Sequence, residues 1–363
     1  MKKWIKEFGN VKRDVIDIWL KPNINAEIFR DWSSIKYEDF VIVSKDDNTI
    51  EKANFYEYKI VIYEEVFEWI TYSIMDNFDK NYDYYWLKNS LRNAYDKRTV
   101  ITGSSYGLFG MDFSQLTDEI NLSLPSQDMF YTTKGIYEVA KNNANIKNII
   151  LCCGYYYFFS DLSRTKNKGG LSRISKVYEP LSWGRHNGFI IPAQENTLYD
   201  SEIFDVDKIA DLYSMGEWEK GYFTPERPRE ITVTKKWTDL SEEEKIISCE
   251  RRAAVHNREI NRTGSLKENI RIFHELVSFC KDNNINLYMV VTPVTNYYYN
   301  NLNKRFKEIF YSVLNDEEYD INVLDFISDA NDMFSDEDFI DTDHLSEIGA
   351  RKFTNIILQA VNE

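Results

Sequence analysis

The sequence predicts a three-layer α/β/α fold of the flavodoxin-like type, with about five parallel strands, an aromatic-rich N-terminal extension and a long insertion. Two observations predict it. Short runs of apolar and β-branched residues alternate with helical patterns over residues 98–361. Some of these runs are apolar almost throughout, as strands are when helices cover both faces of a parallel sheet.

Five runs are the expected strands: Val100–Thr102, Ile120–Leu124, Ile146–Cys153, Leu287–Val291 and Ile321–Phe326. The third and fourth have few polar residues, which is typical of strands buried on both faces. Pro125 directly follows the second and Pro293 closely follows the fourth. Proline lacks a backbone donor, so it indicates where a strand ends.

Three helices are expected in the second half of the chain. The S-x-x-E pattern from Ser265 to Glu268 is a capping box, so the first is expected to begin there and to end at residues 282–284. The second is expected at about residues 298–314. The third is expected at residues 346–357, with its apolar side formed by Ile348, Phe353, Ile356 and Ile357. Right-handed crossovers then give an open, helix-covered sheet.

Two regions do not follow this alternation. Residues 1–95 are rich in Trp, Tyr and Phe and are expected to form a mixed helical extension, in which Tyr56–Val66 fits either strand or helix. The α/β domain is expected to span residues 96–363. Residues 155–262, between the third and fourth strands, are too long for a simple crossover and are interpreted as an insertion near the carboxyl edge of the sheet.

Composition narrows the class of function. Hydrophobic residues are 43% and charged residues 28% of the 363, so the chain can bury a core. A formal charge of −15 argues against nucleic acid or an anionic membrane as a partner. No run reaches the roughly 20 apolar residues of a membrane span, and charged residues interrupt any N-terminal leader, so a cytoplasmic location is expected. The four cysteines have no CxxC spacing and are expected to be reduced.

A glycine-rich loop, Thr102 to Gly110, directly follows the first expected strand. A serine at a sharp strand-to-helix turn exposes its hydroxyl at the sheet edge, and N–H groups at the helix start can face a developing oxyanion. An ordinary turn or a phosphate-cradling loop would have a similar composition. The spacing of Gly103, Gly107 and Gly110, however, matches neither the dinucleotide-binding nor the Walker pattern.

A second group, Asp341-Thr342-Asp343-His344, directly precedes the last expected helix. An Asp three residues before a His can bind one imidazole nitrogen and leave the other free to accept a proton from a serine. A solvated acidic turn, a helix-capping histidine or one ligand of a metal site are the alternatives. Asp343 takes the role of Asp341 only if the local turn differs from the expected one.

Each group makes the catalytic interpretation of the other stronger, because one follows the first expected strand and the other follows the last. In a parallel sheet both loops open at the same edge. At these residues the chain resembles the SGNH (GDSL-like) hydrolase and acyltransferase superfamily, and is closest to its bacterial branch that modifies cell-envelope polymers. The resemblance rests on three blocks: Gly103-Ser104-Ser105, Asn121 to Gln127, and Asp341 to Ser346.

The resemblance implies Ser105 as nucleophile, His344 as general base and Asp341 as the acid that orients it. It implies Ser126, Gly154, Tyr156 and Asn121 as candidates for oxyanion or substrate contacts. The sequence departs from the family where Ser104 replaces Asp, Ser126 replaces a glycine and Tyr156 replaces an asparagine. Asp161 is more simply interpreted as structural, and His186 as a surface histidine with a possible substrate contact.

The leading hypothesis is therefore a serine-dependent acyl transfer, of acetyl above all, or an ester hydrolysis on a carbohydrate or glycan intermediate. The mechanism needs no cofactor and no metal, and the other partner is an acyl donor or acyl ester. The alternative is a catalytically weak protein that keeps the fold and binds partners in a glycan-modification pathway. A phosphate-cradling transferase is a third reading, which leaves the Asp341–His344 pair unexplained.

Overall fold

The computed structural model describes residues 82–165, 168–187, 228–315, 321–327 and 333–362, and four short strands before residue 63. The chain divides into two compact units, one of residues 1–85 and 193–225, the other of residues 86–192 and 226–363. Most of the expected insertion, residues 155–192 and 226–262, thus belongs to the same unit as the strands that flank it. Residues 188–227 of that insertion lie outside the described residues.

The first unit contains a four-stranded parallel sheet in the order β2-β1-β3-β4. Its strands are β1 Lys3–Lys6, β2 Ala26–Phe29, β3 Phe40–Val43 and β4 Lys59–Ile62. Mixed helices were expected here, but strands of four residues are too short to show a clear period. Within Tyr56–Val66, which fitted either structure, β4 is a strand.

The second unit is built on a five-stranded, all-parallel sheet in the order β6-β5-β7-β8-β9. Its strands are β5 Thr99–Gly103, β6 Glu119–Asn121, β7 Asn148–Cys153, β8 Asn286–Val291 and β9 Asn322–Asp325. This is the flavodoxin-like order, in which the first strand in sequence lies second in the sheet. The predicted α/β class is confirmed. The second strand is shorter than expected and ends at Asn121, before Leu122–Leu124.

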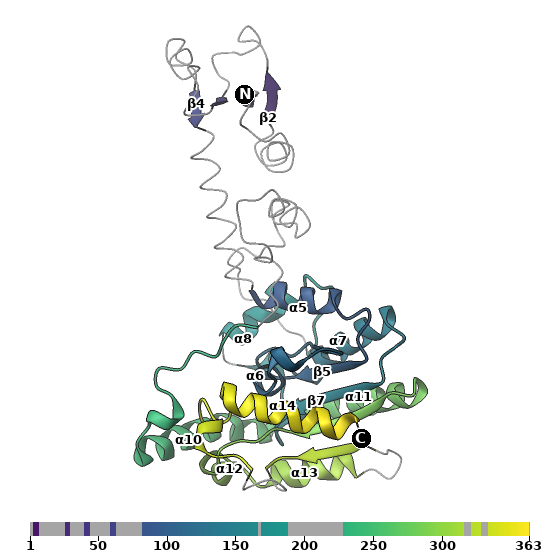
Figure 1. The fold of residues 1–363 in the computed structure, drawn as a ribbon, viewed down its shortest axis with the longest axis vertical. Helices are drawn as coiled ribbons and strands as arrows, with labels where there is room; N and C mark the ends of the chain where they lie inside the picture. Colours follow the sequence, from purple (N-terminus) through teal and green to yellow (C-terminus); the bar gives the residue numbers. More distant parts are fainter. Residues whose placement is uncertain are drawn as a thin grey trace. The chain divides into compact units, whose positions relative to one another are not determined.

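Helices cover the sheet on both faces. The α-helices of the described residues are α5 Tyr82–Arg92, α6 Ser105–Gly110, α7 Met129–Asn142, α8 Lys168–Arg173, α10 Glu242–Asn257, α11 Thr263–Asp282, α12 Asn296–Asn301, α13 Arg305–Leu314 and α14 Glu347–Asn362. Contacts join α6 to α14 and α7 to α11 (Figure 1). Phe158, after β7, contacts both Phe273 of α11 and Phe310 of α13, which places α13 beside α11. Among the described residues, no helix is long and apolar enough to cross a membrane.

Three helical expectations were wrong in detail. The first helix begins at Thr263, and Ser265 inside it donates to the buried Oδ2 of Asp161 at 2.7 Å instead of capping the helix. The expected helix at 298–314 is two helices, α12 and α13, separated at Leu302 to Lys304. In the last helix, Phe353 and Ile357 are buried as expected, but Ile348 is exposed.

Candidate active site

Ser105 is placed by a sharp turn at the end of β5. Gly103 has φ +127°, and a Cβ there would lie 2.0 Å from the carbonyl oxygen of Cys152 on β7, so the turn requires glycine. Ser104 caps α6 by accepting a hydrogen bond from the Tyr106 N–H. Ser105 is then the first residue of α6, where N–H groups have no acceptor within the helix. The half-buried Ser105 lies beyond the carboxyl end of β5, where the strand order reverses between β5 and β7.

The loop before α14 holds the Asp–His group rigidly. Phe339 and Leu345 form an isolated antiparallel bridge, and the Ile340 N–H donates to the His344 carbonyl at 3.0 Å. Thr295, after β8, donates its hydroxyl to the Thr342 carbonyl at 2.7 Å. The loop is therefore closed on itself and attached to the carboxyl end of β8.

The structure brings Ser105, His344 and Asp341 into one hydrogen-bonded line. His344 Nε2 lies 2.9 Å from Ser105 Oγ, and its Nδ1 lies 2.9 Å from Asp341 Oδ2. Asp341 Oδ1 accepts from the His344 N–H at 2.8 Å and the Asp343 N–H at 3.0 Å, which fixes its carboxylate. His344 is buried, with 8% of its surface exposed. An imidazole held by a carboxylate at Nδ1, with a hydroxyl at Nε2, is the arrangement that activates a serine nucleophile.

Asp343 is a second carboxylate near the same imidazole nitrogen and is only 1% exposed. Its Oδ1 is 3.8 Å from His344 Nδ1, too long for a hydrogen bond. Instead, Arg252 Nε of α10 lies 2.9 and 3.0 Å from its two oxygens, and the Tyr106 hydroxyl donates to it at 3.1 Å. Asp341, not Asp343, therefore contacts the histidine directly. Sequence reasoning missed Arg252, because one arginine in a charged helix gives no signal.

These charges shift the protonation of the site. Burial alone would raise the pKa of Asp343, but the Arg252 guanidinium and His344 outweigh it, so the pKa is lowered and Asp343 is ionised. Burial alone would lower the pKa of His344, but Asp343 and Asp341 outweigh it, so the pKa lies above its ordinary value. Burial raises the pKa of Tyr106 well above its usual value, so its phenol stays protonated and donates.

Aromatic side chains surround the network. The Tyr156 hydroxyl donates to the Tyr106 hydroxyl at 3.3 Å, and the Tyr156 ring stacks on His256 with 4.1 Å between centroids. Phe109 meets the His344 ring edge to face at 5.5 Å. Burial and the nearby Arg252 lower the pKa of His256 to about 3, so this second histidine is neutral. Tyr156 thus belongs to the hydrogen-bond network behind the nucleophile.

The other oxyanion candidates have different surroundings. Both ends of the Asn121 amide are used inside the fold, since its Nδ2 donates to the Gly107 carbonyl at 2.8 Å and its Oδ1 accepts from the Ser123 N–H at 2.9 Å. Asn121 therefore supports α6. Ser126 is exposed and has φ +60°, a left-handed conformation that favours glycine. Gly154 is buried against the rings of Tyr106 and Tyr156, where a Cβ would lie 3.0 and 3.1 Å from them.

A second buried group joins Asp128, Asp161 and His186. His186 Nε2 lies 3.1 Å from Asp128 Oδ2, and its Nδ1 lies 3.5 Å from Glu268 Oε1. Burial would lower the pKa of His186, but the hydrogen bond to Asp128 and the surrounding carboxylates raise it to about 9. His186 was expected at the surface and is buried instead, while Asp161 is the structural acid that was expected.

Two groups among the described residues have ligand-type atoms within 4.8 Å of one another: Asp128, Asp161 and His186, and Asp341, Asp343 and His344. In the first, Asp161 accepts from Ser163, Ser265 and Asn187, and the Leu162 N–H donates to Asp128 at 2.6 Å. In the second, Arg252 donates a hydrogen bond to Asp343. A cation at either place would have to displace protein donors.

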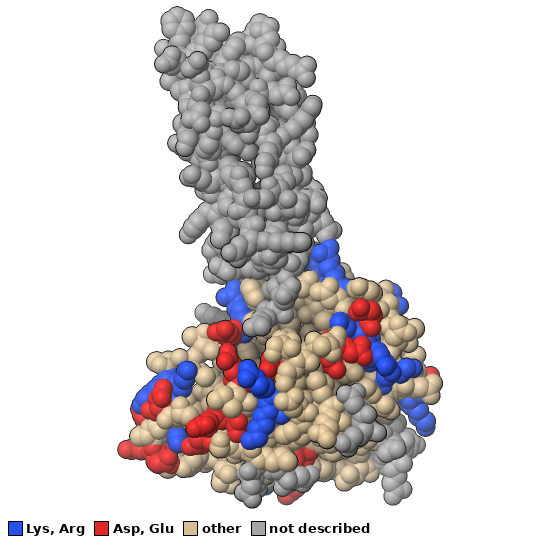
Figure 2. Space-filling view, viewed as in Figure 1, with Lys and Arg blue, Asp and Glu red and all other residues tan. Residues whose placement is uncertain are grey.

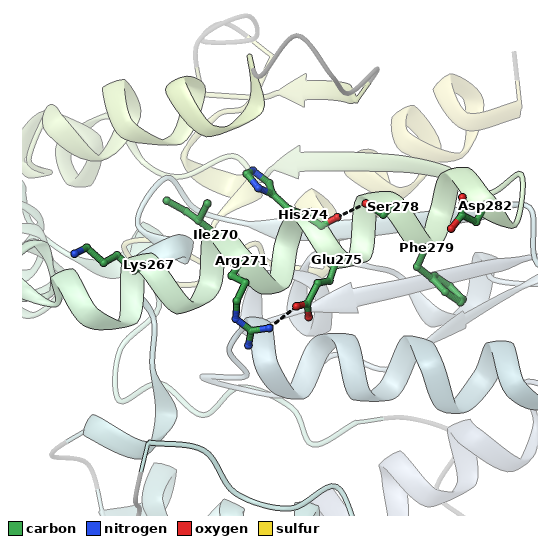
Figure 3. Close-up of a pocket in the computed structure, with 8 residues that line it drawn as sticks. All are labelled: Lys267, Ile270, Arg271, His274, Glu275, Ser278, Phe279 and Asp282. Carbon is green, nitrogen blue, oxygen red and sulfur yellow. Dashed lines mark hydrogen bonds and ion pairs between the residues drawn. The ribbon is translucent and has the colours of Figure 1, made fainter.

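A hollow of about 660 Å³ lies along the exposed side of α11, and Figure 3 shows that one helix supplies the side chains around it. An Arg271–Glu275 ion pair is among its lining residues, and no residue of the Ser105–His344–Asp341 line contributes to it. On the face drawn in Figure 2, Lys and Arg side chains of the described residues are interspersed with Asp and Glu. No model of a known protein family matches the chain, and no curated protein matches it.

Proposed function

We propose that the protein is a serine-dependent enzyme that transfers an acyl group or hydrolyses an ester. The observation that carries the proposal is the line from Ser105 Oγ through His344 to Asp341, with 2.9 Å at each step. Its place at the switch point of a parallel sheet supports it, because sites in such folds form there. The motif resemblance to SGNH hydrolases and acyltransferases agrees with the same three residues.

The reaction follows from the geometry. Ser105 Oγ attacks the acyl carbonyl carbon while His344 Nε2 takes the hydroxyl proton, and Asp341 stabilises the resulting imidazolium. The tetrahedral intermediate collapses as His344 gives its proton to the leaving alcohol, which leaves the acyl group on Ser105. A water or a second hydroxyl then attacks the acyl carbon and loses its proton to His344. His344 returns this proton to Ser105 Oγ as the bond from the acyl carbon to Ser105 breaks. Water gives hydrolysis, and a sugar hydroxyl gives transfer.

The substrate class is proposed as an O-acylated carbohydrate or glycan intermediate, with acetyl as the acyl group. The resemblance to enzymes of cell-envelope polymers supports it. The ring of Phe109 beside His344 agrees with it, because aromatic rings suit the apolar faces of sugars.

Labelling with a fluorophosphonate and peptide mass spectrometry tests the nucleophile. The wild type is expected to gain one adduct on the peptide that contains Ser105, and both Ser105→Ala and His344→Gln should lose it. Ser278→Ala, on the exposed side of α11, is the matched control and should label like the wild type. An adduct that persists in Ser105→Ala would overturn the assignment. A folded wild type that is never labelled would favour a non-catalytic binding protein.

Hydrolysis and transfer are separated by product analysis. The enzyme is incubated with an activated acetyl ester, with and without added oligosaccharides. Hydrolysis releases free acetate in both mixtures, whereas transfer forms acetylated sugar only where oligosaccharide is present. Both products should disappear in Ser105→Ala, because both reactions pass through the same acyl-enzyme.

A further inference from the structure

Two carboxylates lie near the same imidazole nitrogen in the proposed active site. Asp341 Oδ2 lies 2.9 Å and Asp343 Oδ1 lies 3.8 Å from His344 Nδ1. Asp343 is the more deeply buried of the two, so water screens its charge least. Two negative charges this close favour the imidazolium form, yet only a neutral imidazole accepts the proton of a serine. The site therefore needs something that offsets one carboxylate.

Arg252 is placed to do this. Its side chain extends from α10, and its Nε contacts both oxygens of Asp343. A positive charge therefore lies next to the Asp343 carboxylate. The contact occupies only one of its five N–H donors. Among the described residues, no other hydrogen bond or ion pair of Arg252 is found. Its side chain is 35% exposed against 1% for Asp343, so the arginine lies at the boundary between the buried carboxylate and solvent.

No other described neighbour of His344 supplies this positive charge. From α6 it is faced by Ser105, by the protonated phenol of Tyr106 and by the uncharged Phe109. From its own loop it is faced by Asp341 and Asp343. From α10, besides Arg252, it is faced by His256, which is buried, stacked on Tyr156 and hydrogen-bonded to Tyr298. Arg252 is thus the one permanent cation in this part of the described structure.

We propose that Arg252 is a positioning residue that offsets the charge of Asp343 at His344, so that more of His344 is in the neutral form that accepts the Ser105 proton. Asp343 also accepts a hydrogen bond from the hydroxyl of Tyr106, the residue next to Ser105. Asp343 therefore links the two loops that carry the nucleophile and the base, and Arg252 fixes the carboxylate that makes this link. Its role in catalysis rests on the proposed function, but its effect on His344 is a property of the folded protein.

Titration of the histidine ring protons by NMR tests that effect without any turnover. The chain has four histidines, so the His344 signal is identified by its loss in His344→Gln. In Arg252→Gln the pKa of His344 is expected to rise by about 1 unit, because a like charge nearby disfavours the protonated imidazole and this variant removes it. Arg251→Gln removes the neighbouring exposed charge on the same helix and is the matched control, expected to leave the titration unchanged.

A double-mutant cycle separates charge from packing. Asp343→Asn should lower the pKa of His344, and Arg252→Gln combined with Asp343→Asn should return it towards the wild-type value, because a neutral pair has been removed. Arg252→Lys, which keeps the charge, should also stay near the wild type. If Arg252→Gln does not fold, the difference between Asp343→Asn and the double variant still measures the effect of Arg252.

Two outcomes overturn the inference: a His344 pKa in Arg252→Gln equal to that in Arg251→Gln, or a double variant whose pKa stays at the Asp343→Asn value. In enzyme assays, the low-pH limb of kcat/KM should move up by the same amount as the NMR pKa. A shifted NMR pKa with no measurable activity would count against the proposed function alone.

Discussion

Ser105 Oγ and His344 Nε2 lie 2.9 Å apart although 239 positions separate them in the sequence. The parallel sheet makes this possible, because the loops after β5 and β9 both open at its carboxyl edge. Each side chain also has its own local support: Gly103 turns the chain before Ser105, and Asp341 fixes the ring of His344. Four predictions follow, from Asp341, from Gly103, from the positive φ of Ser126 and from the buried His186.

Asp341→Asn should reduce kcat by about 10³–10⁴-fold with a smaller effect on KM, because an amide at this place holds the wrong tautomer of His344. Steady-state kinetics on an activated acetyl ester measures it. Glu347→Gln, an exposed acid at the start of α14, is the control and should keep full activity. Unchanged kcat in Asp341→Asn would mean that another group orients the imidazole.

Gly103→Ala should lower the free energy of unfolding by on the order of 3 kcal/mol, since its Cβ would overlap the carbonyl of Cys152 in the adjacent strand. The paired variant is Gly264→Ala in α11, where a Cβ meets nothing within 4 Å. There alanine should raise the free energy of unfolding by up to about 1 kcal/mol. Urea denaturation of both variants checks the contrast, and equal effects would contradict the described turn.

Ser126→Gly should raise the free energy of unfolding by about 1 kcal/mol, because serine is held at φ +60°, where a Cβ is strained and glycine is not. Ser126→Val should lower it, since β-branched residues tolerate this conformation least. The serine side chain is exposed, so Ser126→Ala should leave activity near the wild-type level. A loss of activity in Ser126→Ala would instead assign the hydroxyl a role in the reaction.

His186 should make stability depend on pH above neutrality. Its pKa is raised to about 9 in the folded protein from an ordinary value of 6.5, so its stabilisation is complete below pH 6.5 and is lost as pH rises through 9. His186→Gln should therefore lower the free energy of unfolding by about 2–3 kcal/mol at pH 6 and by much less at pH 10. Thermal melts of the two proteins across this range measure the difference. A gap that stays constant with pH would mean that packing, such as the Phe130 stack, dominates.

The alternation of strands and helices was readable from the sequence because strands buried on both faces leave long apolar runs. Ile149 to Cys153 are fully buried in β7, and the run containing them was the plainest strand in the chain. The pairing of Ser105 with His344 followed from the same reasoning, since strand order determines which loops meet. Both inferences depend on patterns within a few consecutive residues.

Contacts between distant polar residues were not readable in this way. Ser265 fits a capping box, yet it lies inside α11 and its hydroxyl donates to Asp161, 104 positions away. His186 follows Gly184-Arg185 in a polar stretch that suggests a surface loop, but carboxylates from three other segments bury it. Arg252 gives no local signal either. Each of these roles is defined by its partner, and the partner is far away in sequence.

The order in which the two halves of the site are made has a consequence during synthesis. At about 5–20 residues per second, the ribosome adds His344 roughly 12–50 s after Ser105. Until then the serine has no base, and α14, which follows His344, has not been made. A newly made chain is therefore inert towards esters until almost all of the α/β unit has been translated, so the onset of activity reports completion of the fold.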